Sequence, residues 1–337
     1  MNIEKRIIAG PCSAESYEQV MATAKELAER GVNEFRAGAW KPRTRSGEFE
    51  GYGKDALLWM AAAKREYGLR LWTEVAKPLH VEQALEQGVD YLWIGARTSG
   101  DPFTVQEIAE ALRGTDVKVF VKNPIACDLQ LWMGAIDRVS KCVKEVGAIH
   151  RGFKDINEKK YRNAPFWKVP IELKREIPDI ELLLDPSHLA GNSDLIAEVM
   201  QKGLDLNFDG FMVETHCNPA RAMTDAKQQV TPQQLSEIWK TLVVTRPSLV
   251  GELDELRMNI DEVDKDILKK LAERQLLTNA IGAYKKKNNI QVLQSNRYNE
   301  IILNAQKLGA LLGLDQDFVK RVWEEIHQES VKKQSEL

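Results

Sequence analysis

The sequence lacks any apolar run long enough to cross a bilayer, and its first residues carry no signal-peptide pattern. Cysteine is scarce, since Cys12, Cys127, Cys142 and Cys217 are too few and too widely spaced for a disulfide framework. The net charge is only −3, without the basic excess that binding to nucleic acid or to an anionic membrane needs. We therefore expect a cytoplasmic protein with neither a membrane nor a nucleic-acid partner.

Residues 1–245 alternate between short apolar segments and longer amphipathic ones. Apolar segments such as LRLWTEV, VDYLWIGA and IELLLDP are short enough for strands, and most lack polar alternation, which is typical of strands covered on both faces. Helical spacing marks the segments between them, and several of these end at a glycine. Eight strand–helix units in about 240 residues predict a closed (β/α)8 TIM barrel as the first domain.

A different pattern follows over residues 246–337. From Leu249 the apolar residues recur at steps of three and four, and no proline follows Pro247. This spacing predicts one helix of some 35 to 40 residues, roughly 55–60 Å long, and then two more helices around 295–309 and 315–332. Two shorter helices cannot cover so long an apolar stripe, so we expect this all-α three-helix domain to form a homodimer or a higher homo-oligomer.

Polar residues collect where the predicted strands end, which is the edge at which TIM barrels carry their chemistry. Each has an ordinary explanation by itself: His188 is a loop histidine with satisfied hydrogen bonds, and Cys12 is a small buried apolar side chain. Their convergence on one end of the barrel is harder to attribute to packing. In chain order these residues are Cys12, Arg36, Lys41, Arg43, Thr44, Glu74, Arg97, Lys122, Arg151, His188, Glu214 and Asp225.

Two sets of side chains emerge from this collection. Cys12, His188, Glu214 and Asp225 offer one sulfur, one imidazole and two carboxylates, a mixture that suits a divalent transition metal better than magnesium or calcium. Manganese is our first expectation, with iron, cobalt or zinc as alternatives. So many positive charges around one mouth predict a substrate with several negative charges. The cations of this second set are Arg36, Lys41, Arg97, Lys122 and Arg151.

Six short motifs follow one another along the predicted barrel, and Lys122 ends a predicted strand between the third and the fourth. The motifs are AGPCS, KPRT, IGAR, HRG, DPSH and VETH. The barrel half therefore resembles 3-deoxy-D-arabino-heptulosonate 7-phosphate (DAHP) synthases, of the branch close to KDO phosphate synthase. This resemblance implies a metal-dependent condensation of phosphoenolpyruvate with erythrose 4-phosphate, the first step of the shikimate pathway. Pro-Arg-Thr after Lys41 favours the four-carbon aldose, with a different aldose phosphate as the alternative.

The resemblance also implies residue roles. The first set would hold the metal, the five cations would grip the phosphate and carboxylate of phosphoenolpyruvate, and Arg43 and Thr44 would bind the sugar phosphate. The metal would polarise the aldehyde while the cations fix both substrates in reacting geometry. Glu74 and Lys122 are the candidates for handling the water that adds after condensation. The alternative for Glu74 is simple pairing with neighbouring cations.

Three cations on the predicted long helix invite a similar comparison. Arg274 and Lys285 point within about 20° of one another and can share a ligand, whereas Arg257 lies roughly 25 Å from Arg274 and about 100° around the helix. Solvated charges on a helix flank would show the same spacing. The segment LRMNIDEVDKDILKKLAERQLLTNAIGAYKK, however, resembles the first helix of the all-helical chorismate mutases.

This second resemblance implies a Claisen rearrangement of chorismate to prephenate in an intertwined dimer, with Arg257 reaching the site from the partner chain. Lys285 and Gln334 would stabilise the ether oxygen as it gains charge. Gln294 and Tyr298 depart from the acids common at those positions, which predicts weak mutase activity. The positions that match the family's site are Arg257, Arg274, Lys285, Arg297, Ser330 and Gln334.

Regulation is expected through the helical domain. The first predicted strand begins within ten residues of the start, which leaves no room for a regulatory domain before the barrel. The helical domain would bind prephenate, a later product of the pathway, and a site for a later product can serve in feedback control. We therefore predict that prephenate inhibits the synthase. The alternative is a helical domain that dimerises and senses without catalysing a reaction.

Overall fold

The computed structural model of the chain describes residues 5–42, 47–243 and 250–336. The chain divides into two compact units, residues 1–245 and 246–337, and each has its own architecture. Among the described residues, no helix combines the length and the apolar character needed to cross a membrane.

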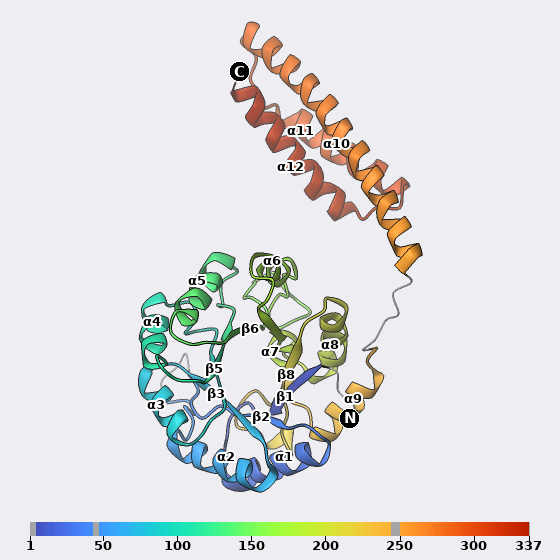
Figure 1. Cartoon of the computed structure of the whole chain (residues 1–337). Coiled ribbons are helices and arrows are strands. Elements are labelled where there is room, and N and C mark those ends of the chain that lie inside the picture. The colour runs from blue at the N-terminus through green and yellow to red at the C-terminus, as the bar shows by residue number, and fades with distance from the viewer. Residues whose placement is uncertain (1–4, 43–46, 244–249, 337) are drawn as a thin grey trace. The chain divides into compact units, whose positions relative to one another are not determined.

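The first unit is a closed barrel of parallel strands in sequence order, so the predicted TIM barrel is confirmed (Figure 1). β1 closes the ring by pairing with β8, in a register that sets Arg6 opposite Gly210 and Gly10 opposite Glu214. The strands are β1 (Arg6–Gly10), β2 (Glu34–Arg36), β3 (Arg70–Val75), β4 (Tyr91–Ile94), β5 (Lys118–Lys122), β6 (Val146–His150), β7 (Glu181–Leu184) and β8 (Gly210–Glu214).

Helices alternate with these strands and surround the barrel (Figure 1). They are α1 (Tyr17–Glu29), α2 (Lys54–Tyr67), α3 (Pro78–Glu86), α4 (Pro102–Ala111), α5 (Leu129–Ser140), α6 (Lys168–Glu176), α7 (Pro186–Ala190), α8 (Ile196–Asp205) and α9 (Pro232–Thr241). Short 3-10 turns are η1 (Ser193–Leu195), η2 (Pro219–Arg221) and η3 (Ala226–Gln228).

Local sequence fixes where these helices begin and end. The Ser16 side chain accepts from the backbone of Gln19 and caps α1, and Thr231 and Gln234 form a reciprocal capping box before α9. Gly68 ends α2 in the left-handed conformation that glycine adopts without steric cost. These boundaries keep each helix short enough to return the chain to the start of the next strand.

Two apolar layers hold the barrel together. One lies between the strands and the surrounding helices, where α1 for example buries Val20, Ala24 and Leu27. The other fills the inside of the barrel and leaves only the strand ends for polar side chains. This inner cluster consists of Ile8, Trp72, Trp93, Phe120, Ile149, Leu183 and Met212.

The second unit contains α10 (Val250–Lys287), α11 (Ser295–Leu311) and α12 (Gln316–Ser335), as the sequence predicts (Figure 1). α12 packs against both α10 and α11. Part of the apolar stripe of α10 stays in solvent in the single chain: Ile260 is 60% exposed, Val263 59% and Ile267 52%. One chain therefore leaves a large part of this helix face uncovered.

Candidate active sites

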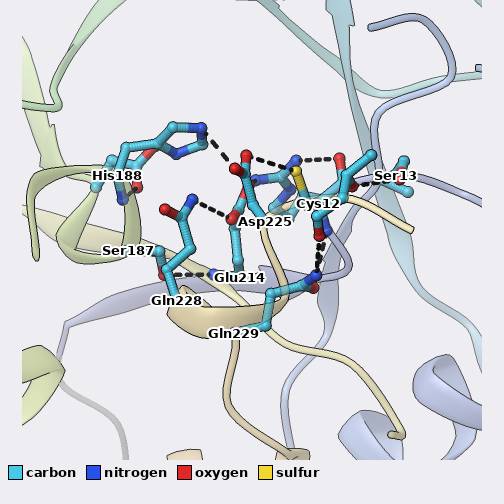
Figure 2. A network of polar contacts seen from close by, with 12 residues as sticks. Cys12, Ser13, Ser187, His188, Glu214, Asp225, Gln228 and Gln229 are labelled. Carbon is cyan, nitrogen blue, oxygen red and sulfur yellow. Dashed lines mark hydrogen bonds and ion pairs between the residues drawn. The ribbon is translucent and has the colours of Figure 1, made fainter. Parts of the chain in front are cut away.

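The closure of the barrel brings distant parts of the chain to one point. Cys12 follows β1 and Glu214 ends β8, and these two strands are neighbours in the ring (Figure 2). Asp225 lies in the loop after β8, and one ligand atom from each of these three residues lies within 4.8 Å of the other two. His188, from α7, places Nε2 3.7 Å from Glu214 Oε1. Three residues of the predicted metal-binding set therefore form one cluster, and the fourth, His188, lies beside it at Glu214.

This cluster has the chemistry of a ligand set for a divalent transition metal. The Cys12 thiol is buried, with Asp225 Oδ2 at 3.3 Å and Lys41 Nζ at 2.9 Å from its sulfur. Burial raises the pKa of that thiol to about 12, and the charge of Glu214 adds to the increase while Lys41 opposes it. One soft sulfur, two carboxylates and a nearby imidazole suit manganese, iron, cobalt or zinc.

Both carboxylates of the cluster are held in the charged form. Burial disfavours their ionisation, but His188 and Arg162 keep the pKa of Asp225 below its ordinary value. His188 and Arg36 lower the pKa of Glu214 against the same penalty. Arg36 and Arg162 help to stabilise two charged carboxylates beside one another, and a bound divalent ion would stabilise them further.

Arg36 lies deeper than a substrate-binding cation would. It is 1% exposed, and its guanidinium donates to Glu214 Oε1 and to the backbone oxygen of Cys12, both at 3.0 Å. It is not among the residues that line the neighbouring cavity. These contacts favour a role in holding Glu214 over the predicted direct grip on phosphoenolpyruvate.

A cavity of about 440 Å³ opens beside the cluster, and cations dominate its wall. Lys154 and Arg162 belong to this wall and were not predicted from the sequence. Arg43 and Thr44, predicted to bind the sugar phosphate, lie outside the described residues. The predicted residues in the wall are Lys41, Glu74, Arg97, Lys122, Arg151, His188 and Asp225.

Asp185 belongs to the DPSH motif but is not one of the predicted site residues. Its carboxylate contacts the side chains of Lys122 and His188. Its buried carboxylate accepts from Lys122 Nζ at 2.5 Å, and Oδ2 lies 2.8 Å from His188 Nδ1. A carboxylate at Nδ1 leaves Nε2 of the imidazole directed at the ligand cluster, which is a common arrangement around metal-binding histidines. Asp185 thus connects the predicted substrate cation with the predicted metal ligand.

Glu74 is held by a neighbour from β4, and Arg151 by a residue of the loop between β6 and α6. Glu74 Oε2 accepts from the indole of Trp93 at 2.9 Å, and a Cβ added to Gly95 would lie 2.2 Å from Glu74 Oε1. Arg151 donates to Asn163 Oδ1 at 2.9 Å. Burial lowers the pKa of Arg151 to about 10, so it remains a cation at neutral pH.

Sequence reasoning missed several side chains that support the cluster. Gln229 Oε1 accepts from the backbone of Cys12 at 3.1 Å, and Asn163 donates to the backbone oxygen of His188 at 2.7 Å. Arg162 and Gln228 contact the carboxylate ligands. Gln228 ends the short turn η3 and the others lie in loops, so none of them belongs to a periodic pattern, and the amides also lack a charge that would single them out.

A second cavity, of about 450 Å³, lies among α10, α11 and α12. Arg274 donates to Ser330 Oγ at 2.5 Å, and Lys285 donates to Gln334 Oε1 at 3.1 Å. Of the described residues predicted for this site, only Arg257 is absent from the cavity wall, as expected if it serves another chain's site. The predicted residues in the wall are Arg274, Lys285, Arg297, Ser330 and Gln334, and Gln294, a departure from the family pattern, also lines it.

His327 is a further wall residue that the sequence did not single out. It precedes Ser330 by one helical turn, and its ring meets that of Tyr298 edge-on at 4.7 Å between centroids. Burial, with the charges of Arg274 and Lys285, lowers the pKa of His327. Tyr298, one of the two departures from the family pattern, therefore packs against this neutral imidazole.

The residue before Arg151 has a structural role with a measurable pH dependence. His150 is fully buried among aromatic rings, and Nε2 donates to the backbone oxygen of Pro165 at 2.8 Å. Burial lowers the pKa of His150 to about 3. Because the folded protein keeps this histidine neutral while the unfolded chain protonates it, folding stability is lost as pH falls below the unfolded pKa.

We therefore expect His150 to account for about 2 kcal/mol of the stability that the barrel loses between about pH 7.5 and about pH 5. His150→Gln keeps the donor to Pro165 and should remove that share of the loss. Urea unfolding followed by tryptophan fluorescence measures it, since all tryptophans except Trp323 lie in residues 1–245. His327→Gln, in the other unit, is the control. An equal loss in wild type and His150→Gln would contradict the assignment.

Comparison with known proteins finds a family match for each of the two units. Residues 3–249 match the family model described as the DAHP synthetase I family, and residues 256–335 match the model described as chorismate mutase type II. The chain is 29% identical over 247 residues to phospho-2-dehydro-3-deoxyheptonate aldolase of Thermotoga maritima, a match that covers 73% of this chain and 70% of that protein.

Two further similarities concern the barrel. The chain is 25% identical over 259 residues to 2-dehydro-3-deoxyphosphooctonate aldolase of Wolinella succinogenes, covering 68% of this chain and 94% of that protein. A crystal structure of DAHP synthase from Thermotoga maritima superposes with a TM-score of 0.63 at 27% identity, covering 70% of this chain and 67% of that one.

Proposed function

The chain belongs to the DAHP synthetase I family and carries a chorismate mutase type II domain after the barrel, and on this basis we propose that it catalyses two reactions of the shikimate pathway. The barrel condenses phosphoenolpyruvate with erythrose 4-phosphate to DAHP and phosphate in a metal-dependent reaction. The helical unit rearranges chorismate to prephenate. The observation that carries the first proposal is the convergence of a thiol, an imidazole and two carboxylates beside a cation-lined cavity.

Charge fixes phosphoenolpyruvate in this cavity. Arg97, Lys122 and Arg151, with Lys41, hold its phosphate and carboxylate, and Arg43 and Thr44 hold the phosphate of the aldose. Fixing both anions brings the enol carbon of one substrate against the aldehyde carbon of the other, which lowers the entropic part of the barrier. When bound by the four predicted ligands, a divalent ion supplies a Lewis acid for the aldehyde oxygen.

After the carbon–carbon bond forms, water adds to the electron-poor carbon left behind and phosphate departs. Glu74 lies in the cavity wall as a carboxylate with one oxygen held by Trp93, so it can take the proton of that water. Lys122, which forms an ion pair with Asp185, donates to the substrate oxygens. In the alternative, Glu74 only pairs with neighbouring cations, and its electrostatic interaction with Lys41 in the same cavity wall supports that role.

Metal removal tests the barrel reaction. Chelation should abolish the loss of phosphoenolpyruvate in the presence of erythrose 4-phosphate, and adding back manganese, iron, cobalt or zinc should restore it, because the ligand cluster is otherwise four side chains without a Lewis acid. His188→Ala and Cys12→Ala should stay inactive after the addition. A five-carbon aldose phosphate in the same assay separates the two aldose alternatives. Condensation that persists in the chelated Cys12→Ala protein would overturn the metal role.

The apolar face of α10 is the basis for proposing a homodimer through the helical unit. Ile260, Val263 and Ile267 recur at steps of three and four and remain more than half exposed in one chain. A second copy of α10 offers the same stripe, and mutual burial would remove both from water. It would also let Arg257 reach the cavity around Arg274 of the other copy.

A double substitution Ile260→Asp and Ile267→Asp tests this dimer, because it places charges in the proposed apolar contact. We expect a monomeric mass by light scattering and loss of chorismate rearrangement, since Arg257 no longer arrives. The control is Lys269→Asp, on the opposite side of the same helix, which changes an exposed charge paired with Asp266. A double variant that remains dimeric would contradict the proposed interface.

Feedback inhibition by prephenate is the third part of the proposal. The cavity with Arg274, Lys285 and Arg297 suits a dicarboxylate, and prephenate is such an anion. We expect Arg274→Ala to lower chorismate rearrangement about 100–1000-fold and to abolish inhibition of the barrel by prephenate, while condensation without prephenate stays unchanged. Lys270→Ala serves as the control. A wild type that is inhibited but never consumes chorismate supports the sensor-only alternative. Full inhibition of Arg274→Ala would place the prephenate site elsewhere.

A further inference from the structure

One arginine of the barrel cavity, Arg162, contacts a carboxylate of the ligand cluster. It lies in the loop between β6 and α6, and Nη1 donates to Asp225 Oδ1 at 2.9 Å and to Gln228 Oε1 at 2.6 Å. Its backbone is fixed as well, because its N–H donates to the oxygen of Ala190 at 3.1 Å. The Arg162 side chain also packs on Gly191, where an added Cβ would lie 2.3 Å from Arg162 Cβ. The guanidinium is therefore held in place from the β7 side of the barrel.

Gln228 extends this contact to the second carboxylate. Its side chain is buried, and because Oε1 accepts from Arg162, the amide nitrogen must face the other way. Nε2 donates to Glu214 Oε2 at 2.7 Å, as Figure 2 shows. Arg162 and Gln228 thus form a continuous chain of hydrogen bonds from the cavity wall to both carboxylates, which we call the Arg162–Gln228 brace.

The brace leaves the other oxygens of these carboxylates facing the cluster. Asp225 Oδ2 lies 3.3 Å from the sulfur of Cys12, and Glu214 Oε1 lies 3.7 Å from Nε2 of His188. Each carboxylate therefore has one oxygen bound by the brace and one directed at the cluster, where Glu214 Oε1 also accepts from Arg36 at 3.0 Å. This division of oxygens is what monodentate coordination of one ion would need.

The backbone at Asp225 also depends on outside support. Asp225 adopts φ 49° and ψ 35°, the left-handed region that costs a non-glycine residue roughly 1–2 kcal/mol. The N–H of Gln228 donates to its backbone oxygen at 3.1 Å, while Arg162 holds its side chain. Without the brace, this loop has less to keep Asp225 turned towards Cys12.

We propose that Arg162 and Gln228 are positioning residues that set the geometry and affinity of the metal centre. The proposal rests on the proposed metal dependence and deepens it. Residues that orient metal ligands typically affect metal affinity about 10–100-fold. Arg162 also belongs to the cavity wall, so direct binding of a substrate phosphate is the competing role.

Cobalt(II) binding to the metal-stripped full-length protein separates these roles, because a cobalt–thiolate absorption band reports the geometry at Cys12 without any turnover. We expect Arg162→Gln and Gln228→Leu to weaken cobalt affinity, measured against a chelating dye, about 10–100-fold and to alter the band. Gln228→Glu keeps an acceptor for Arg162 but replaces the donor to Glu214 with a carboxylate, so it should weaken affinity similarly. Far-UV circular dichroism checks that each variant is folded.

Arg175→Gln provides the matched control, because Arg175 is an exposed arginine paired with Glu172 and Glu176 on α6. It should bind cobalt as the wild type does. Unchanged cobalt affinity and absorption in both Arg162→Gln and Gln228→Glu would overturn the brace. An Arg162→Gln protein with only a raised KM for a substrate would do the same and assign Arg162 to substrate binding. A wild type that binds no cobalt would instead overturn the metal centre itself.

Discussion

Parallel pairing of β1 with β8 is the constraint on which the catalytic end of the barrel depends. It sets Gly10 opposite Glu214, so that Cys12, near the start of the chain, lies beside a carboxylate some two hundred residues later. No local interaction could create this proximity. The ring must close in the correct register first, and the inner cluster around Trp72, Trp93 and Phe120 stabilises that closure. The ligand cluster is in this sense a product of the whole barrel.

Charge balance is the second condition that the barrel site meets. Glu214 and Asp185 are buried carboxylates, and each contacts a buried cation, Arg36 and Lys122 respectively. An unpaired charge at this depth would be strongly destabilising, so breaking either pair would leave its partner at considerable cost. The same contacts help to keep the pKa of both acids below its ordinary value against the effect of burial, before any substrate arrives. Electrostatic preorganisation of this kind needs no rearrangement when charge develops during the reaction.

Much of this architecture could be predicted from the sequence. The period of the apolar residues predicted both the closed barrel and the long helix, which spans 38 residues, and the ordered motifs predicted the two families that the comparisons support. The rule that polar residues gather at strand ends singled out Cys12 and Glu214. It could not tell how deep Arg36 lies, because an inward-facing cation on a strand contacts either ligand or substrate depending on the packing around it.

The sequence did not predict the residues that act by positioning other side chains. Arg162 and Gln228 lie within loops, where neither periodicity nor strand ends mark a position, and they matter only through contacts made across the barrel mouth. Arg257 presents the opposite case, since its helical position was predicted while its proposed contacts require a second chain.

The glycine of the IGAR motif, Gly95, is constrained by a side chain on the neighbouring strand. At Gly95 an added methyl group would occupy the volume of a Glu74 carboxylate oxygen, so the two positions share one space. Glu74 on the adjacent strand therefore limits which residues can stand at position 95. A relative without this glutamate could carry a larger residue there. Co-occurrence of glycine and glutamate at these two positions among relatives would thus record shared volume rather than two independent chemical requirements.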